Sequence, residues 1–246
     1  MPQLALTRLL NHLFGPMLTA AMQAIGIHPA LPAAPIGDTF TLELLVVCGL
    51  IAFFLVVRLS LSVENPNPVQ HIAEVIHEFT GSQAESVIGH GYQRFQAFVT
   101  CVLLFILLNN LFGLLAGFPG MDTPTSKPAV PLGIAVLTFL YYNYHGVRVH
   151  GPIGYLKTLA GPLWWLAWLL FPIEIISHLA RMMSLTIRLY ANMMASDLLT
   201  LICFSFVPAV APVAALGLHF FVALVQAYVF MLLSMIYVGM AVSHEH

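Results

Sequence analysis

The sequence predicts an all-α integral membrane protein with about five membrane-inserted helices, the last two forming a long, strongly tilted hairpin, plus an amphipathic surface helix. Of its 246 residues, 60% are hydrophobic and only 7% are charged, and the mean hydropathy is +0.92. A soluble domain needs a larger share of charged residues to cover its surface. The composition therefore places most of the chain in a bilayer.

Five apolar segments indicate membrane spans, because about 20 apolar residues cross the roughly 30 Å of bilayer hydrocarbon. The last two are 35 and 31 residues long, or about 52 and 46 Å as helices. Neither fits upright in a bilayer, so both must be strongly tilted, broken or shielded by a partner. The five spans cover about residues 40–61, 95–118, 129–144, 172–206 and 212–242.

Two less apolar segments lie outside these spans. Residues 1–38 are moderately apolar but are interrupted by Gly15 and Pro16, which favours a surface or partly inserted segment over a signal peptide. Over about residues 68–80, apolar side chains recur at helical spacing, which predicts a helix lying along the membrane surface. We therefore expect a single membrane domain over residues 39–246, preceded by an N-terminal segment.

Composition also argues against several classes of ligand. The net charge is −2 and the eight lysines and arginines are scattered, which argues against nucleic acid binding. Cys48, Cys101 and Cys203 lie far apart in apolar segments, without the spacing of a metal site or a disulfide framework. We expect no cofactor and no bound metal.

Basic residues near the span ends indicate the orientation in the membrane. Arg58 and Arg94 flank one loop, and Arg148 and Lys157 lie in another loop on the same side. The opposite side offers only Lys127. Because cytoplasmic loops are enriched in lysine and arginine, five crossings predict an N-terminus outside the cell and a C-terminus in the cytoplasm.

The fourth span carries four charged residues, Glu174, Arg181, Arg188 and Asp197. Facing lipid at mid-depth, four such groups would cost roughly 10 kcal/mol even on the lenient insertion scale. Arg188 stays protonated at any physiological pH, and no acid stands three or four residues away to neutralise it. We therefore expect its counter-charge from elsewhere, for example from another subunit.

Helical spacing sorts these charges onto different faces. At about 100° per residue, Glu174, Arg181 and Arg188 fall within about 40° of one another. Asp197 lies about 180° around the helix from Arg188, so the two need not form an ion pair. The same polar stripe as Arg188 also includes Ser177, Ser184 and Asn192.

The last span has a matching stripe of His219, Gln226 and Tyr237 on one helix face. If the last two spans form a hairpin, Arg188 comes level with Gln226, and Asp197 comes level with His219 about two turns nearer the turn. A carboxylate beside an imidazole is a proton-exchange pair at physiological pH, whereas an arginine beside an amide is a fixed charge held in place.

Other interpretations remain open at this point. A single polar residue in a membrane helix is often a structural hydrogen-bonding group, so His219 or Gln226 alone would not establish function. A proton-coupled secondary transporter could also place arginine, aspartate and histidine in tilted helices, although the chain shows none of the internal repeats usual in such proteins. A haem-binding membrane enzyme would need facing histidines, but His178 and His219 are predicted at different depths.

Several stretches of the chain resemble subunit a of the rotary F-type ATP synthase. The resemblance covers about residues 40–246 and is most specific around Arg188. The matching motifs are EIISHLAR at residues 174–181, SLTIRLYANM at 184–193, QAYVFM at 226–231, IYV at 236–238, PNPVQ at 66–70 and FILLNNLFGL at 105–114.

This resemblance implies the stator half of an ion channel, with no catalytic site of its own. In that family an arginine faces a rotating ring of proteolipid c subunits that carry buried carboxylates, and two aqueous half-channels reach the interface from opposite sides. Arg188 would be the separator, Asp197 and His219 would belong to the outer half-channel, and Gln226 would orient Arg188. Further candidates for the proton pathway are Asn192, Glu174, Arg181, Ser184, Tyr237 and Asn110.

The resemblance also implies partners and a location. The partners are the c ring, the b-type subunits of the peripheral stalk, the rest of the ATP synthase complex and membrane lipid. The location is an energy-coupling membrane, namely the bacterial inner membrane.

Overall fold

The computed structural model describes residues 4–24, 35–62, 66–115, 123–160, 167–206 and 211–242. All regular secondary structure in these ranges is helical. The elements are α1 (Ala5–Ala24), α2 (Asp38–Leu59), α3 (Pro68–Ile88), α4 (Gln93–Leu115), the 3₁₀ turn η1 (Pro124–Ser126), α5 (Ala129–Ala160), α6 (Ala167–Phe206) and α7 (Ala211–Val242). Within the described ranges, α2, α4, α6 and α7 are long and apolar enough to cross a membrane. The predicted all-α membrane fold is confirmed.

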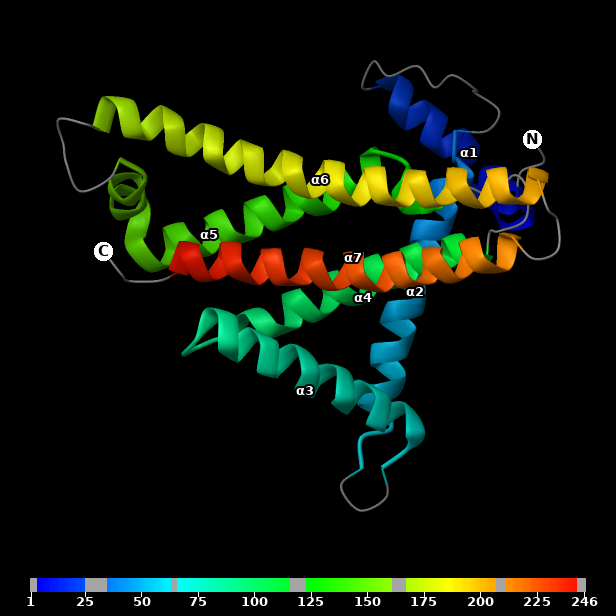
Figure 1. Cartoon of the computed structure of the whole chain (residues 1–246), viewed down its shortest axis with the longest axis horizontal. Coiled ribbons are helices and arrows are strands. Elements are labelled where there is room, and N and C mark those ends of the chain that lie inside the picture. Colours follow the sequence, from blue (N-terminus) through cyan, green and yellow to red (C-terminus); the bar gives the residue numbers. More distant parts are fainter. Residues whose placement is uncertain are drawn as a thin grey trace.

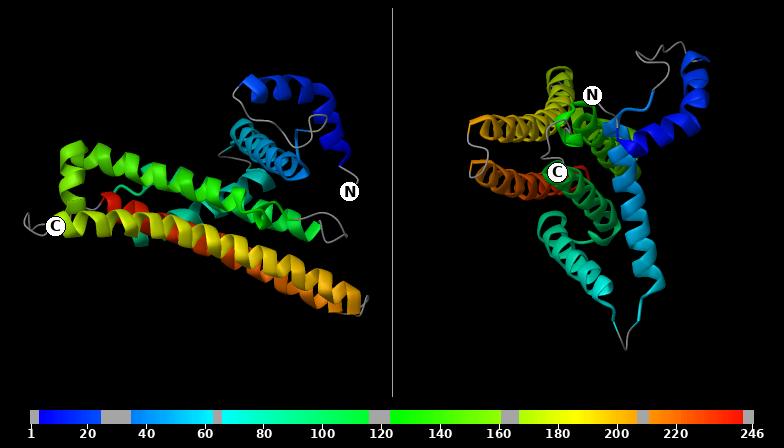
Figure 2. Two further views of the ribbon diagram at one scale, coloured as in Figure 1. Left: turned by 90° about the horizontal axis from the view of Figure 1, so that it is seen from above. Right: turned by 90° about the vertical axis from the view of Figure 1, so that its right-hand side faces the viewer.

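α6 and α7 form the predicted long hairpin and lie side by side along the longest axis of the molecule (Figure 1). α2 crosses them steeply, and the right-hand view of Figure 2, taken roughly along the hairpin, shows α2 at full length. α2 has 22 residues, or about 33 Å, which matches a bilayer only when the helix stands upright. With α2 upright, α6 and α7 are strongly tilted, as α6 needs with its 40 residues.

The core forms where α7 passes between α4, α5 and α6. Ala223 and Ala227 are fully buried on α7 and allow close helix approach, while Phe230, Met231 and Met235 fill the space around them. α6 contributes mainly one buried stripe, including Leu185, Leu189 and Met193. The other faces of α6 stay exposed, so α6 lies at the edge of the bundle.

Two helices run past their predicted ends. α3 continues beyond residue 80, because Gly81 and Ala84 are small enough to be buried against neighbouring helices, and it ends at Gly89 with φ of +80°. α5 continues beyond residue 144 to Ala160, with one kink at Gly151 where φ is +73°. Arg148 therefore lies in a helix instead of the predicted loop.

The remaining predicted boundaries lie near gaps in the described residues. Lys157, predicted in the same loop as Arg148, also falls within α5. The end of the second predicted span at 116–118, the turn of the hairpin near Pro208 and the C-terminal residues 243–246 lie outside the described residues. In the N-terminal segment, α1 is tied to the start of α2 by a hydrogen bond of 3.1 Å from the hydroxyl of Thr7 to that of Thr41.

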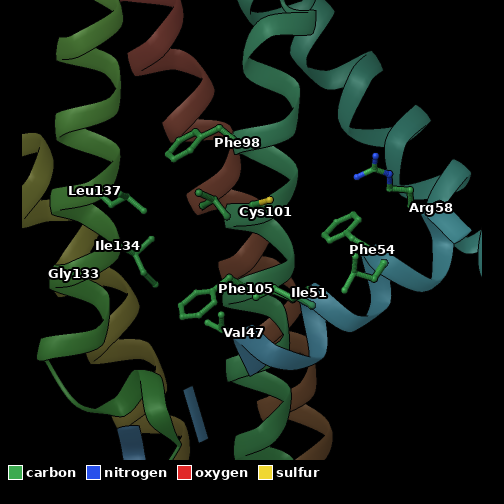
Figure 3. A pocket seen from close by; sticks show the side chains of 13 residues that line it. Val47, Ile51, Phe54, Arg58, Phe98, Cys101, Phe105, Gly133, Ile134 and Leu137 are labelled. Carbon is green, nitrogen blue, oxygen red and sulfur yellow. The ribbon is translucent and has the colours of Figure 1, made fainter. Parts of the chain in front are cut away.

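α2 stands partly apart from the bundle and leaves a groove of about 670 Å³ against α4 and α5. Figure 3 shows Phe54 from α2, Phe98 and Phe105 from α4 and Ile134 from α5 around this groove, with Arg58 at one end. The lining is almost entirely apolar, which suits hydrocarbon and offers no polar chemistry. The candidate functional residues lie elsewhere, on the hairpin.

Candidate functional site

Arg188 lies on the exposed side of α6, between the buried residues Leu185 and Leu189. Within the part of the chain that the structure describes, its guanidinium makes no hydrogen bond and no ion pair. Ser184 and Asn192, one turn before and one turn after, are also exposed. These three residues form one polar strip along α6.

Asp197 and His219 meet across the hairpin, as the predicted register requires. The Oδ1 atom of Asp197 lies 3.7 Å from Nδ1 of His219, and the histidine side chain is only 2% exposed. The other ring nitrogen of His219, Nε2, is buried and has no hydrogen-bond partner among the described residues. His219 therefore lies inside the bundle, and half-buried Asp197 meets it on a different side of α6 from Arg188.

The segment before α5 also contacts this pair. The hydroxyl of Thr123 donates a 2.7 Å hydrogen bond to Oδ1 of Asp197, and the backbone N–H of Thr123 lies 3.4 Å from Oδ2. Thr125 donates a 2.6 Å bond to the side-chain oxygen of Asn110, whose amide in turn donates to the backbone carbonyl of Ala223. Asn110 is thus a buried bridge between η1 and α7. Sequence reasoning missed both threonines.

Gln226 pairs with a different residue than predicted. Its Oε1 accepts a 2.7 Å hydrogen bond from Nδ2 of Asn192, whereas Arg188 makes no hydrogen bond to it. Gln226 is 4% exposed and points into the bundle, while Arg188 points out of it. The predicted contact between Arg188 and Gln226 is therefore replaced by one from the neighbouring turn of α6.

A second polar cluster surrounds Arg181 nearer the start of α6. A guanidinium nitrogen of Arg181 lies 3.2 Å from the carboxylate of Glu174, and Nε2 of His178 lies 3.5 Å from the same oxygen. Tyr142 on α5 shares a 2.7 Å hydrogen bond with Nδ1 of His178. The Arg181 guanidinium also lies 5.8 Å from the ring centre of Tyr237 on α7, a cation–π distance. Arg181 therefore has partners that Arg188 lacks.

Sequence reasoning did not predict the roles of two members of this cluster. The sequence singles out His178 only as a possible haem ligand and does not single out Tyr142 as a member of a polar cluster, whereas the structure joins Tyr142 to His178 and His178 to Glu174. The i, i+4 spacing of Glu174 and His178 was the available signal.

Among the described residues, no group of three or more His, Cys, Asp or Glu side chains could hold a metal ion.

Comparison with known proteins identifies the family. The sequence model described as ATP synthase A chain matches residues 40–239. The chain belongs to the ATP synthase A chain family. It is 46% identical to ATP synthase subunit a of Koribacter versatilis over 99% of this chain and 98% of the relative. The corresponding protein of Solibacter usitatus is 44% identical over 90% of this chain and 93% of the relative.

A more distant relative gives the same result. ATP synthase subunit a of Bdellovibrio bacteriovorus is 43% identical over 71% of this chain and 75% of the relative. These matches confirm the predicted resemblance and favour a multi-pass subunit of an ATP synthase over the secondary transporter and the haem enzyme. This A chain therefore belongs with the rest of an ATP synthase complex.

Proposed function

We propose that this A chain is the proton-conducting stator of a rotary ATP synthase, and that Arg188 separates two offset half-channels. Its partners are a ring of c subunits with membrane-buried carboxylates and the b-type subunits of the peripheral stalk. The observation that carries the proposal is the exposed guanidinium of Arg188, which has no partner among the described residues.

The surroundings of Arg188 favour a protein partner over lipid. Met183 and Ile187 beside it are 48% and 55% exposed, so this face of α6 meets either hydrocarbon or an apolar surface. An arginine facing lipid costs about 3 kcal/mol even on insertion scales. A helical ring with an apolar outer surface and a carboxylate at the depth of Arg188 would pack against the apolar residues and neutralise the charge of Arg188.

The polar clusters on either side of Arg188 suit two half-channels. Along α6, Asp197 lies about 13 Å beyond Arg188 and Glu174 about 21 Å before it, at 1.5 Å per residue. The positive charge between them favours an ionised ring carboxylate and repels a proton moving directly from one cluster to the other. Protons must then travel on the ring.

We assign Asp197 and His219 to the half-channel that opens outside the cell. A carboxylate and an imidazole 3.7 Å apart can pass a proton between them, and Nε2 of His219 remains available for a proton-carrying water. Asn110 holds η1 in place beside this pair. Gln226 and Asn192 continue the polar path from the pair toward Arg188.

The cytoplasmic half-channel then runs along Glu174, Arg181 and Ser184. Tyr237 packs on Arg181 and holds its guanidinium close to Glu174. In this arrangement the N-terminus lies outside the cell, the C-terminus lies in the cytoplasm, and the membrane is the bacterial inner membrane. Each proton that crosses yields about 2.3 kcal/mol per 100 mV, so several must cross for each ATP.

Replacing Arg188 with alanine tests the proposal. In the assembled complex in inverted membrane vesicles, we expect Arg188→Ala to reduce ATP-driven proton pumping to background, measured by quenching of a pH-sensitive dye. The matched control is Arg94→Ala, because Arg94 is exposed at the start of α4 and lies outside the proposed proton pathway. Normal pumping by an assembled Arg188→Ala complex would contradict the proposal.

A further inference from the structure

The carboxylate of Asp197 is held by a residue from outside the hairpin. Thr123 lies 74 positions earlier in the chain, yet its hydroxyl donates to Oδ1 of Asp197 and its backbone N–H to Oδ2. Its side-chain hydroxyl and Nδ1 of His219 approach the same oxygen, Oδ1. Thr123 is only 1% exposed, whereas the Asp197 side chain is 26% exposed, so the contact is buried on the threonine side.

A glycine on α4 makes room for this contact. A methyl group added at Gly113 would lie 2.6 Å from Cγ2 and 2.8 Å from Cβ of Thr123, and it would overlap the hydroxyl oxygen. A Cβ atom does not approach other non-bonded atoms so closely in folded proteins. Because Thr123 is buried, its side chain has no free space into which it could move. Only glycine at position 113 lets Thr123 sit against α4 and reach Asp197.

The segment that follows Thr123 is anchored to α4. Thr125, two residues on, is fully buried and bonds to Asn110 of α4, and Asn110 bonds to the backbone of Ala223 on α7. The hydroxyl of Ser126 donates a further bond of 2.7 Å to the carbonyl of Thr123. Thr123 therefore has a defined position relative to α4, α6 and α7, and its hydroxyl has a defined direction.

We propose that Thr123 is a positioning residue for proton transfer, which keeps Oδ1 of Asp197 directed at His219, and that Gly113 provides the necessary space. The inference rests on the proposed function of the Asp197–His219 pair. The Asp197 side chain is 26% exposed. Without the hydroxyl of Thr123, the 2.7 Å bond to Oδ1 is lost and only the longer 3.4 Å contact from the backbone N–H remains. The carboxylate can then turn away from the imidazole, and the transfer distance lengthens.

The complex is assembled in membrane vesicles, and its catalytic part is then stripped off. Passive proton flux through the remaining membrane part is measured under a potassium diffusion potential. Thr123→Val keeps the shape of the side chain but removes the hydroxyl, and we expect about tenfold slower flux, as for loss of one hydrogen bond to a charged group. Thr123→Ser keeps the donor and should restore most of the flux. The matched control, Thr138→Val, removes an equally buried hydroxyl that bonds only within its own helix and should leave the flux unchanged.

A second pair of variants tests the same contact without touching Thr123. Gly113→Ala should slow the flux as Thr123→Val does, because the methyl group displaces the threonine. Gly133→Ala is its control, since a methyl group there meets nothing within 4 Å. Copurification of the c ring verifies assembly for every variant, and Gly113→Ala decides the outcome if Thr123→Val does not assemble.

A double variant distinguishes failure of this inference from failure of the proposed function. With Asp197→Asn present, Thr123→Val should cause no further loss of flux, because the group that it positions no longer titrates. If Asp197→Asn alone leaves the flux unchanged, the assigned role of Asp197 is wrong. If Asp197→Asn slows the flux while Thr123→Val and Gly113→Ala do not, or if the two losses simply multiply, the positioning role of Thr123 is overturned.

Discussion

Arg188 and Asp197 lie nine residues apart on one helix, yet their surroundings are opposite. Asp197 is reached by the hydroxyl and the backbone of Thr123 and by His219 from α7. Arg188 is exposed on an apolar face and has no partner within the described ranges. A charge with partners in its own chain is held still, whereas an unpaired charge on an apolar face is available to a partner that comes and goes.

The same contrast separates the two arginines of the stripe. Arg181 has Glu174, Ser177 and the ring of Tyr237 within reach, all in its own chain. Arg188 lies two turns further along the same face, and no hydrogen bond, ion pair or cation–π contact joins it to the described residues. One stripe of sequence therefore contains a neutralised arginine and an unneutralised one, and only the second suits a moving counter-charge.

Giving Arg188 an acid of its own should remove this contrast, with the largest expected effect. In Ser184→Glu the new carboxylate stands one turn before Arg188, at the spacing that favours an ion pair. It would compete with the proposed ring carboxylate, and we expect ATP-driven pumping to fall at least about tenfold. The measurement is dye quenching in inverted vesicles, with Ser184→Gln as the uncharged control of the same shape. Normal pumping by Ser184→Glu would show that Arg188 does not need to remain unpaired.

Removing the charge of Asp197 should have a smaller effect. Asp197→Asn keeps the hydrogen bond from Thr123 but loses the titrating group beside His219, so proton flux should slow without being abolished. We also expect its dependence on pH between about 6 and 8 to flatten, because the imidazole no longer exchanges protons with a carboxylate. Passive flux in stripped vesicles measures both effects, and an unchanged flux over that range would rule out the assignment.

The hairpin could be predicted because helix geometry is regular. Spacings of seven and nine residues place side chains on known faces of a helix, so the meeting of Asp197 with His219 follows from the register alone. That Arg188 has no counter-charge in its own helix follows from the absence of an acid three or four residues away. Both predictions use only local periodicity and one turn between two helices.

The errors arise where that regularity ends. Gln226 bonds to Asn192 and not to the expected Arg188. Equal depth in the hairpin does not make two side chains face each other, and Arg188 points out of the bundle while Gln226 points into it. Thr123 was missed because a loop residue has no periodic pattern, and its partner is 74 positions away. The lengths of α3 and α5 depend on tertiary packing, which apolar periodicity does not report.

The most direct test asks which side of α6 faces the ring. After the cysteines at positions 48, 101 and 203 are replaced by serine, single cysteines at Ser184 and Ile187 on the exposed side are compared with one at Met193, which is 0% exposed. Each is combined with a cysteine near the ring carboxylate, and disulfide formation is followed on gels under oxidising conditions. We expect cross-links from positions 184 and 187 and none from position 193. Cross-linking from position 193 alone would contradict this expectation.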